Sequence, residues 1–146
     1  MEDKVKLFQQ KAESYLCCYN SHCPRCGQCL RYEVGQYAAP TQRIVTAVNP
    51  RYEHGADGTC HLFRDNQPLL MPVGMMQHFY YDMPGRIERA IKRRLIAANC
   101  RTTYYKYHRG DRPITPDVLS LITRVCREEG WQGPLQFDGE VEDYLW

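Results

Sequence analysis

Thiol side chains are concentrated in the first part of this sequence. Five of the eight cysteines fall between residues 17 and 29, and a sixth stands at residue 60 beside His61. Within the cluster, Cys23-Pro24-Arg25-Cys26-Gly27 has the form of a metal knuckle, in which two thiolates two residues apart hold one ion. Core packing does not explain such clustering. The sequence therefore predicts a metal site formed among Cys18, Cys23, Cys26, Cys29 and Cys60.

Zinc suits these ligands best. Thiolates are soft ligands, four of them complete a tetrahedron, and Zn²⁺ has no redox chemistry that the protein must control. The spacing of Cys23, Cys26 and Cys29 also matches part of a ferredoxin-type run, so an iron–sulfur cluster or a redox protein is an alternative. The next cysteine of that run is missing, because Glu33 occupies its position. We expect a structural zinc ion, and which four cysteines ligate it stays open.

The sequence contains no recognisable catalytic constellation. Its five histidines are scattered, and none forms a pattern with Ser or Asp. A catalytic zinc keeps an open position with His or Glu among its ligands, whereas this cluster is rich in sulfur and is expected to be closed. We therefore predict that the protein is not an enzyme. Cys100 and Cys126 lie on or beside apolar helical stretches and are predicted to be core residues.

The composition is that of an ordinary globular protein. The chain of 146 residues has 43% hydrophobic and 25% charged residues, which suits one domain. We expect a single domain over 1–146, with a soft subdivision into a Cys-rich metal-binding part (1–70) and a helical part with an acidic tail (71–146). The start has no apolar signal region, and no stretch is long and apolar enough for a membrane span. These features favour a cytoplasmic protein without membrane contact. In the cytoplasm, clustered cysteines are expected to be reduced and to act as metal ligands. A secreted fragment with disulfides is the competing interpretation.

Charge is distributed unevenly along the chain. Residues 86–112 contain nine basic and two acidic side chains, for a net charge of +7, whereas residues 128–146 contain six acidic and no basic side chains. Cations neutralise phosphates and tyrosine rings stack on unpaired bases, so a nucleic-acid interface is an alternative function. A solvated helix face explains the same pattern, and the acidic tail would compete for the cations, so we expect weak binding and a protein as the main partner. The candidate interface residues are Arg86, Arg89, Arg93, Tyr104, Tyr105, Lys106 and Arg109.

Hydrophobic periodicity and turn signals predict an α+β fold. The predicted helices cover residues 4–16, 28–39, 75–81, 84–99 and 116–129. The predicted strands cover residues 43–48, 59–63 and 103–108, and residues 65–75 are predicted to be a loop. A short antiparallel sheet would then belong to the Cys-rich part, reached through the turn at 55–58, and the C-terminal half would be mainly helical.

Several motifs are spread along nearly the whole chain. They are Cys18-x4-Cys23-Pro24, Cys29-Leu30-Arg31, Val48-Asn49-Pro50, Cys60-x2-Phe63 and Tyr104-Tyr105-x-Tyr107-x-Arg109-Gly110-Asp111-Arg112-Pro113-Ile114-x-Pro116. Together they resemble a family of small, uncharacterised bacterial proteins, a domain of unknown function. The resemblance implies a reduced, cytosolic, Cys-containing protein, but it brings no activity with it. Combined with the predicted zinc site, it favours a protein-interaction or regulatory module.

Overall fold

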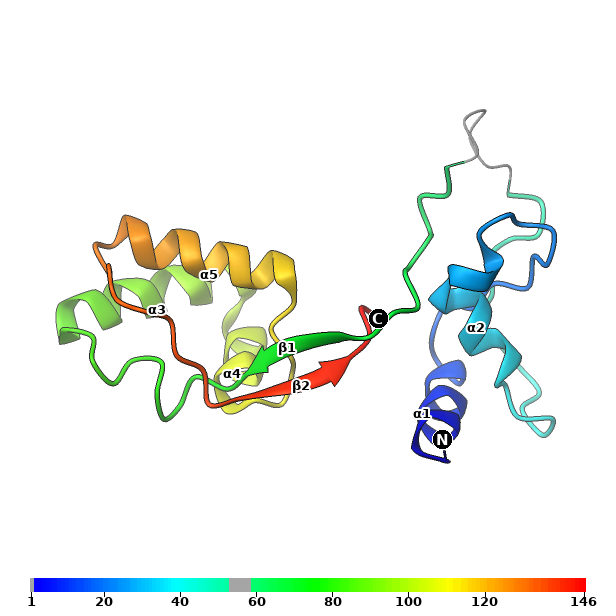
Figure 1. The fold of residues 1–146 in the computed structure, drawn as a ribbon, viewed down its shortest axis with the longest axis horizontal. Helices are drawn as coiled ribbons and strands as arrows, with labels where there is room; N and C mark the ends of the chain where they lie inside the picture. Colours follow the sequence, from blue (N-terminus) through cyan, green and yellow to red (C-terminus); the bar gives the residue numbers. More distant parts are fainter. Residues whose placement is uncertain (1, 53–58) are drawn as a thin grey trace. The chain divides into compact units, whose positions relative to one another are not determined.

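A computed structural model describes residues 2–52 and 59–146 of the chain. The chain divides into two compact units. The first unit consists of Met1–Pro68 together with Tyr144–Trp146, and the second unit consists of Leu69–Asp143 (Figure 1). None of the helices in the described ranges is long and apolar enough to cross a membrane.

The first unit is built from short helices around a small aromatic core. It contains α1 (Glu2–Ala12), the 3-10 helix η1 (Cys26–Gln28) and α2 (Leu30–Gln36). Phe8 of α1 is fully buried, and the rings of Tyr37, Tyr144 and Trp146 meet it edge-on at centroid distances of 5.1–5.8 Å. The predicted helices at 4–16 and 28–39 are therefore present but shorter than expected. The buried residues of this core are Phe8, Ala12, Cys17, Leu30 and Val34.

The two strands predicted for the Cys-rich part are wrong. Residues 43–48 form only an isolated parallel bridge, between Ala47 and Cys17, and residues 59–63 form turns and irregular structure. The β-branched residues that suggested a strand find no apolar surface to cover, since Ile44 is 83% exposed. A segment with high β-propensity forms a strand only where packing or a neighbouring strand stabilises it. The predicted turn at 55–58 lies outside the described residues.

The second unit contains a two-stranded sheet and three helices. Strand β1 (Leu69–Val73) pairs antiparallel with β2 (Gly139–Asp143), in a register that runs from Leu69 opposite Asp143 to Val73 opposite Gly139 (Figure 1). The helices are α3 (Gly85–Asn99), α4 (Arg101–Arg109) and α5 (Pro116–Glu128). The α+β class is thus confirmed and is mostly helical in the described ranges. The sheet, however, forms from the predicted loop and the acidic tail.

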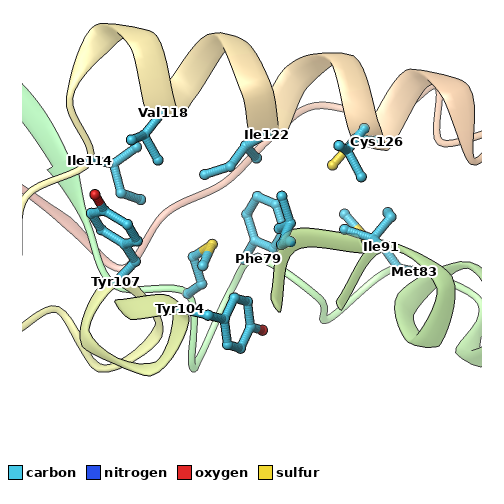
Figure 2. Packing of buried hydrophobic residues seen from close by; sticks show 12 residues of the cluster. Phe79, Met83, Ile91, Tyr104, Tyr107, Ile114, Val118, Ile122 and Cys126 are labelled. Carbon is cyan, nitrogen blue, oxygen red and sulfur yellow. The ribbon is translucent and has the colours of Figure 1, made fainter. Parts of the chain in front are cut away.

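The core of the second unit lies where α5 packs with α3 and α4 (Figure 2). The start of α5 matches its sequence signals, because Thr115 is the N-cap residue and Pro116 is the first helical residue. Leu119, whose spacing in the sequence also suggests the apolar face of this helix, is only partly buried. The buried side chains of α5 are Val118, Ile122, Val125 and Cys126, and they meet Ile91 and Leu95 of α3 and Tyr104 and Tyr107 of α4.

Two other predicted elements of this unit are wrong. The predicted strand at 103–108 is part of α4, because Tyr104 and Tyr107, three residues apart, both bury their rings on one helix face. The predicted helix at 75–81 is a series of turns. There the carboxylate of Asp138 accepts the N–H groups of residues 76–78 and replaces helical hydrogen bonds.

One of the two cysteines predicted to be core residues is not buried. Cys126 lies in the core of the second unit, as predicted. Cys100 is exposed at the junction between α3 and α4, where its φ angle of 58° separates the two helices. An apolar stripe upstream of Cys100 suggested burial, but that stripe ends with α3.

Candidate metal centre

The five cysteines predicted to bind a metal line one small cavity in the first unit. The cavity volume is about 20 Å³. Since 10–15 Å³ is about the volume that one water-sized probe occupies, the cavity has room for a single small ion. No carboxylate or histidine of the described residues lines it. The lining consists of Cys18, Cys23, Cys26, Cys29 and Cys60 together with Asn20, Arg31, Tyr32, Val48, Leu62 and Phe63.

Backbone hydrogen bonds bring three separate segments to this cavity. The N–H of Cys18 donates to the carbonyl of Arg31 at 2.9 Å, which ties the first cysteines to α2. The N–H of Leu30 donates to the carbonyl of Arg64 at 2.7 Å, and an isolated antiparallel bridge joins Cys29 to Asp65. The segment after Cys60 is therefore held against the start of α2, although the described residues form no sheet there.

The knuckle itself is a run of tight turns. The N–H of Cys26 donates to the carbonyl of Cys23, and the N–H of Cys29 donates to the carbonyl of Cys26, each at 3.1 Å. This repeat of three residues includes η1. The spacing seen in the sequence thus becomes a series of turns whose cysteines all line the cavity.

A buried arginine also faces the cavity. Arg31 is only 9% exposed; its Nε donates to the carbonyl of Leu62 at 2.7 Å, and one Nη donates to the carbonyl of Leu16 at 3.0 Å. Its guanidinium lies 5.0 Å from the ring centre of Tyr15. Within the part of the chain that the structure describes, Arg31 has no acidic partner. We did not predict a role for Arg31; the signals in the sequence are its place two residues after Cys29 and its part in the motif Cys29-Leu30-Arg31.

The cysteine thiols line the same cavity, but in the part of the chain that the structure describes they are not arranged around one metal position. In residues 2–52 and 59–146, no group of three or more Cys, His, Asp or Glu side chains is positioned to hold a metal ion. Cys17 does not line the cavity: it is fully buried, burial raises the pKa of its thiol, and its sulfur lies 3.4 Å from the carbonyl of Tyr15. His61 is exposed and is also not part of the lining.

The predicted nucleic-acid residues are separated by the fold into exposed and buried sets. Tyr104 is 1% exposed and its ring belongs to the core, so it is not available to stack on a base, contrary to the prediction. Tyr105 is half-buried. The exposed members are Arg86, Arg89 and Arg93 on α3 and Lys106 and Arg109 on α4.

Part of the acidic tail does pair with the basic segment, at Arg94. The guanidinium of Arg94 contacts the carboxylates of Glu128 and Glu129. Arg109 pairs with its neighbour Asp111 at 2.7 Å. Arg94, which makes this contact between the two charged segments, was not among the candidates.

Comparison with known proteins identifies one relationship. No curated protein and no solved structure matches this chain. The family comparison matches residues 1–146 to DUF6078, described as a family of unknown function. That match agrees with the resemblance seen in the motifs and covers every residue of the sequence. The chain therefore belongs to the DUF6078 family.

Proposed function

We propose that the first unit is a zinc-binding module, in which four of the five cavity thiolates hold one structural Zn²⁺ and stabilise a protein that acts through binding or regulation. The observation that carries this proposal is the composition of one cavity. Five thiols from separate segments and a buried guanidinium without an acidic partner in the described residues share it.

The charge of Arg31 supports a loaded site. Burying a cation without an anion nearby is costly. With neutral thiols, the described residues give the Arg31 guanidinium two carbonyl acceptors and the face of the Tyr15 ring, but no carboxylate. Four thiolates and one Zn²⁺ carry a net charge of −2, so the metal centre would supply the missing negative charge. Arg31 would in turn offset part of the thiolate charge, as groups around a metal centre commonly do.

The size of the first unit gives the metal a structural task. Its described core has five buried residues, which is few for a unit that must fold largely through its own contacts. Free energy gained when zinc binds a site that exists only in the folded state is folding free energy. A zinc ion would therefore hold together the loops that hydrogen bonds connect at Cys18, Leu30 and Arg64.

Elemental analysis of reduced, purified protein tests the proposal directly. We expect about one zinc per chain, as for a four-thiolate structural site. Iron with visible absorbance would instead indicate an iron–sulfur cluster. Absence of both metals, in protein kept reduced and away from chelators, would refute a metal site.

A pair of serine variants tests which thiols matter. Cys23→Ser should lose zinc and lower the stability of the first unit, since one ligand of the tetrahedron is removed. Cys100→Ser is the matched control, because Cys100 is exposed and lies in the second unit, and its zinc content should equal that of the wild type. Arg31→Met, which keeps most of the side-chain length but removes the charge, should weaken zinc binding. Unchanged zinc content and melting temperature in Cys23→Ser would show that Cys23 is not a ligand.

A further inference from the structure

The outer face of α3 carries a row of three arginines. Arg86, Arg89 and Arg93 lie on the side of the helix opposite the buried Ile91 and Leu95, and all three are exposed. With a rise of 1.5 Å per residue, they stand about 4.5 Å and 6 Å apart along the helix axis. Such a row presents positive charge along one line of the surface.

These three cations lack carboxylate partners in the described structure. None of them has an ion pair or a hydrogen bond to an acidic side chain within residues 2–52 and 59–146. The acidic segment that was expected to cover them contacts Arg94 instead. The competition expected from the sequence is thus directed to a different side of α3.

An exposed aromatic ring precedes the row. Tyr81 is 84% exposed, whereas Tyr104 and Tyr107 of the same unit are buried. Its backbone N–H donates to the carbonyl of His78 in a turn that Asp138 holds through backbone hydrogen bonds. The guanidinium of Arg89 reaches back over Gly85, 3.5 Å from where a Cβ would stand, and so brings charge to the end of α3 nearest Tyr81 in sequence.

We infer that Tyr81 and the arginine row of α3 form a binding surface for single-stranded nucleic acid. The arginines contact successive phosphates, and the ring of Tyr81 stacks on an unpaired base. This pairing of a cationic track with an exposed aromatic ring is how proteins bind single strands without sequence preference. A duplex offers phosphates but no free base face, and an acidic peptide offers neither. The surface lies in the second unit and does not depend on the proposed zinc site.

The test is fluorescence anisotropy with a labelled oligothymidine of about 20 nucleotides, which exceeds the span of one such surface, and the full chain. The affinity should fall as salt rises, with a log–log slope of about −2 for three phosphates on a single strand. Arg89→Glu combined with Arg93→Glu should weaken binding by at least about 10-fold and flatten this slope. Tyr81→Ala should weaken binding about 5- to 100-fold through lost stacking, with the slope unchanged. All of these side chains are exposed, so circular dichroism should be unchanged.

Arg124→Glu is the matched control, because Arg124 is an exposed arginine on α5 of the same unit. It should leave the affinity within about twofold of the wild type, as expected for a charge outside the α3 row. Equal losses for Arg124→Glu and for the α3 reversals would overturn the proposal, since they would indicate general attraction to net charge. Absence of binding at about 50 mM salt, where phosphate contacts are strong, would also overturn it. Tyr81-dependent binding to anionic phosphatidylserine vesicles, with none to the oligonucleotide, would assign the surface to membranes instead.

Discussion

Replacing Asp138 by asparagine should destabilise the second unit. The Asp138 carboxylate accepts three backbone N–H groups, from Met76 at 2.7 Å and from Gln77 and His78 at 3.0 Å each. It stands directly before β2, and its own N–H donates to the carbonyl of Gly74 at 3.1 Å. This one side chain therefore fixes the turn that follows β1 against the start of β2.

The size of the effect follows from the acceptors that the Asp138→Asn variant retains. The amide oxygen of the new side chain can still accept from Gln77 and His78, but as a neutral oxygen. Its NH₂ group would face the N–H of Met76, where two donors cannot bond. Hydrogen bonds to charged groups contribute about 1.5–3 kcal/mol, and neutral ones about 1 kcal/mol. Because water reaches part of this turn, we expect a net loss of about 2 kcal/mol.

Urea unfolding followed by tryptophan fluorescence measures this loss. The two tryptophans lie in different units, Trp131 in the second and Trp146 in the first. In a Trp146→Phe background, the signal reports the second unit alone and a ring is kept against Phe8. With a slope of about 1 kcal/mol per molar urea, the midpoint should fall by about 2 M. Asp82→Asn is the control, because Asp82 is exposed and accepts no hydrogen bond in the described structure.

The dependence on pH identifies the charge as the cause. Burial raises the pKa of Asp138, but the three backbone N–H groups and His78 together lower it below its ordinary value of 3.8. A carboxylate with a lowered native pKa contributes its full stability above the ordinary pKa and loses it as pH falls through the native one. The stability difference between the wild type and the Asp138→Asn variant should thus be constant from about pH 5 to 7 and shrink below about pH 4. A loss under about 0.5 kcal/mol at neutral pH, the size of an ordinary surface substitution, would refute this reasoning.

Two further predictions concern the core and the thiols of the second unit. Ile122→Ala should lower the free energy of unfolding in urea by about 3 kcal/mol, because the Ile122 side chain of α5 is 1% exposed in the core. Leu119→Ala should lower it clearly less, because Leu119 is only partly buried. Equal losses would contradict the assigned core face. At about pH 8, iodoacetamide should modify Cys100 at least about 10-fold faster than Cys126, as judged by peptide mass spectrometry. The Thr103 hydroxyl lowers the pKa of the exposed Cys100, while burial raises the pKa of Cys126 to about 11, so comparable rates in folded protein would count against this arrangement.

Helices with clear local signals, α3 and α5, were predicted from the sequence, whereas α4 was taken for a strand and the pairing of distant segments was missed. The N-cap Thr115, the first-turn Pro116 and the stripe around Ile122 all lie within one helix and therefore identify α5. Strand β1 contains Pro72, which suggested a loop, and its partner β2 lies about 70 residues later. The carbonyl of Pro72 accepts from the N–H of Ile114 and so points away from β2. Because the backbone nitrogen of a strand residue points to the same side as its carbonyl, the ladder needs no N–H donor at Pro72, and the proline is tolerated.

The five cysteines predicted to bind a metal line one cavity, including Cys60, which is remote in sequence. Their clustering in the sequence indicated that they lie together, whereas the metal itself stays a prediction. Arg31 was not predicted, since an arginine in a helix is normally solvated and only the fold reveals its burial. Tyr104 failed as a candidate for the opposite reason: tyrosine suits both core and surface, and its spacing to Tyr107 favoured the core.

The pairing of Leu69 with Asp143 makes the second unit an insertion whose two ends are neighbours. The last three residues of the chain belong to the first unit, where Tyr144 and Trp146 meet Phe8. While residues 69–143 are unfolded, docking those rings closes a loop of about 75 residues, at an entropic cost of about 4 kcal/mol. Once β1 and β2 pair, the ends stand about 5 Å apart and most of this cost is removed. Folding of the second unit therefore favours the docking of Tyr144 and Trp146 in the first unit, because it brings the two ends of the insertion together. The stabilities of the two units are thus thermodynamically coupled through the chain.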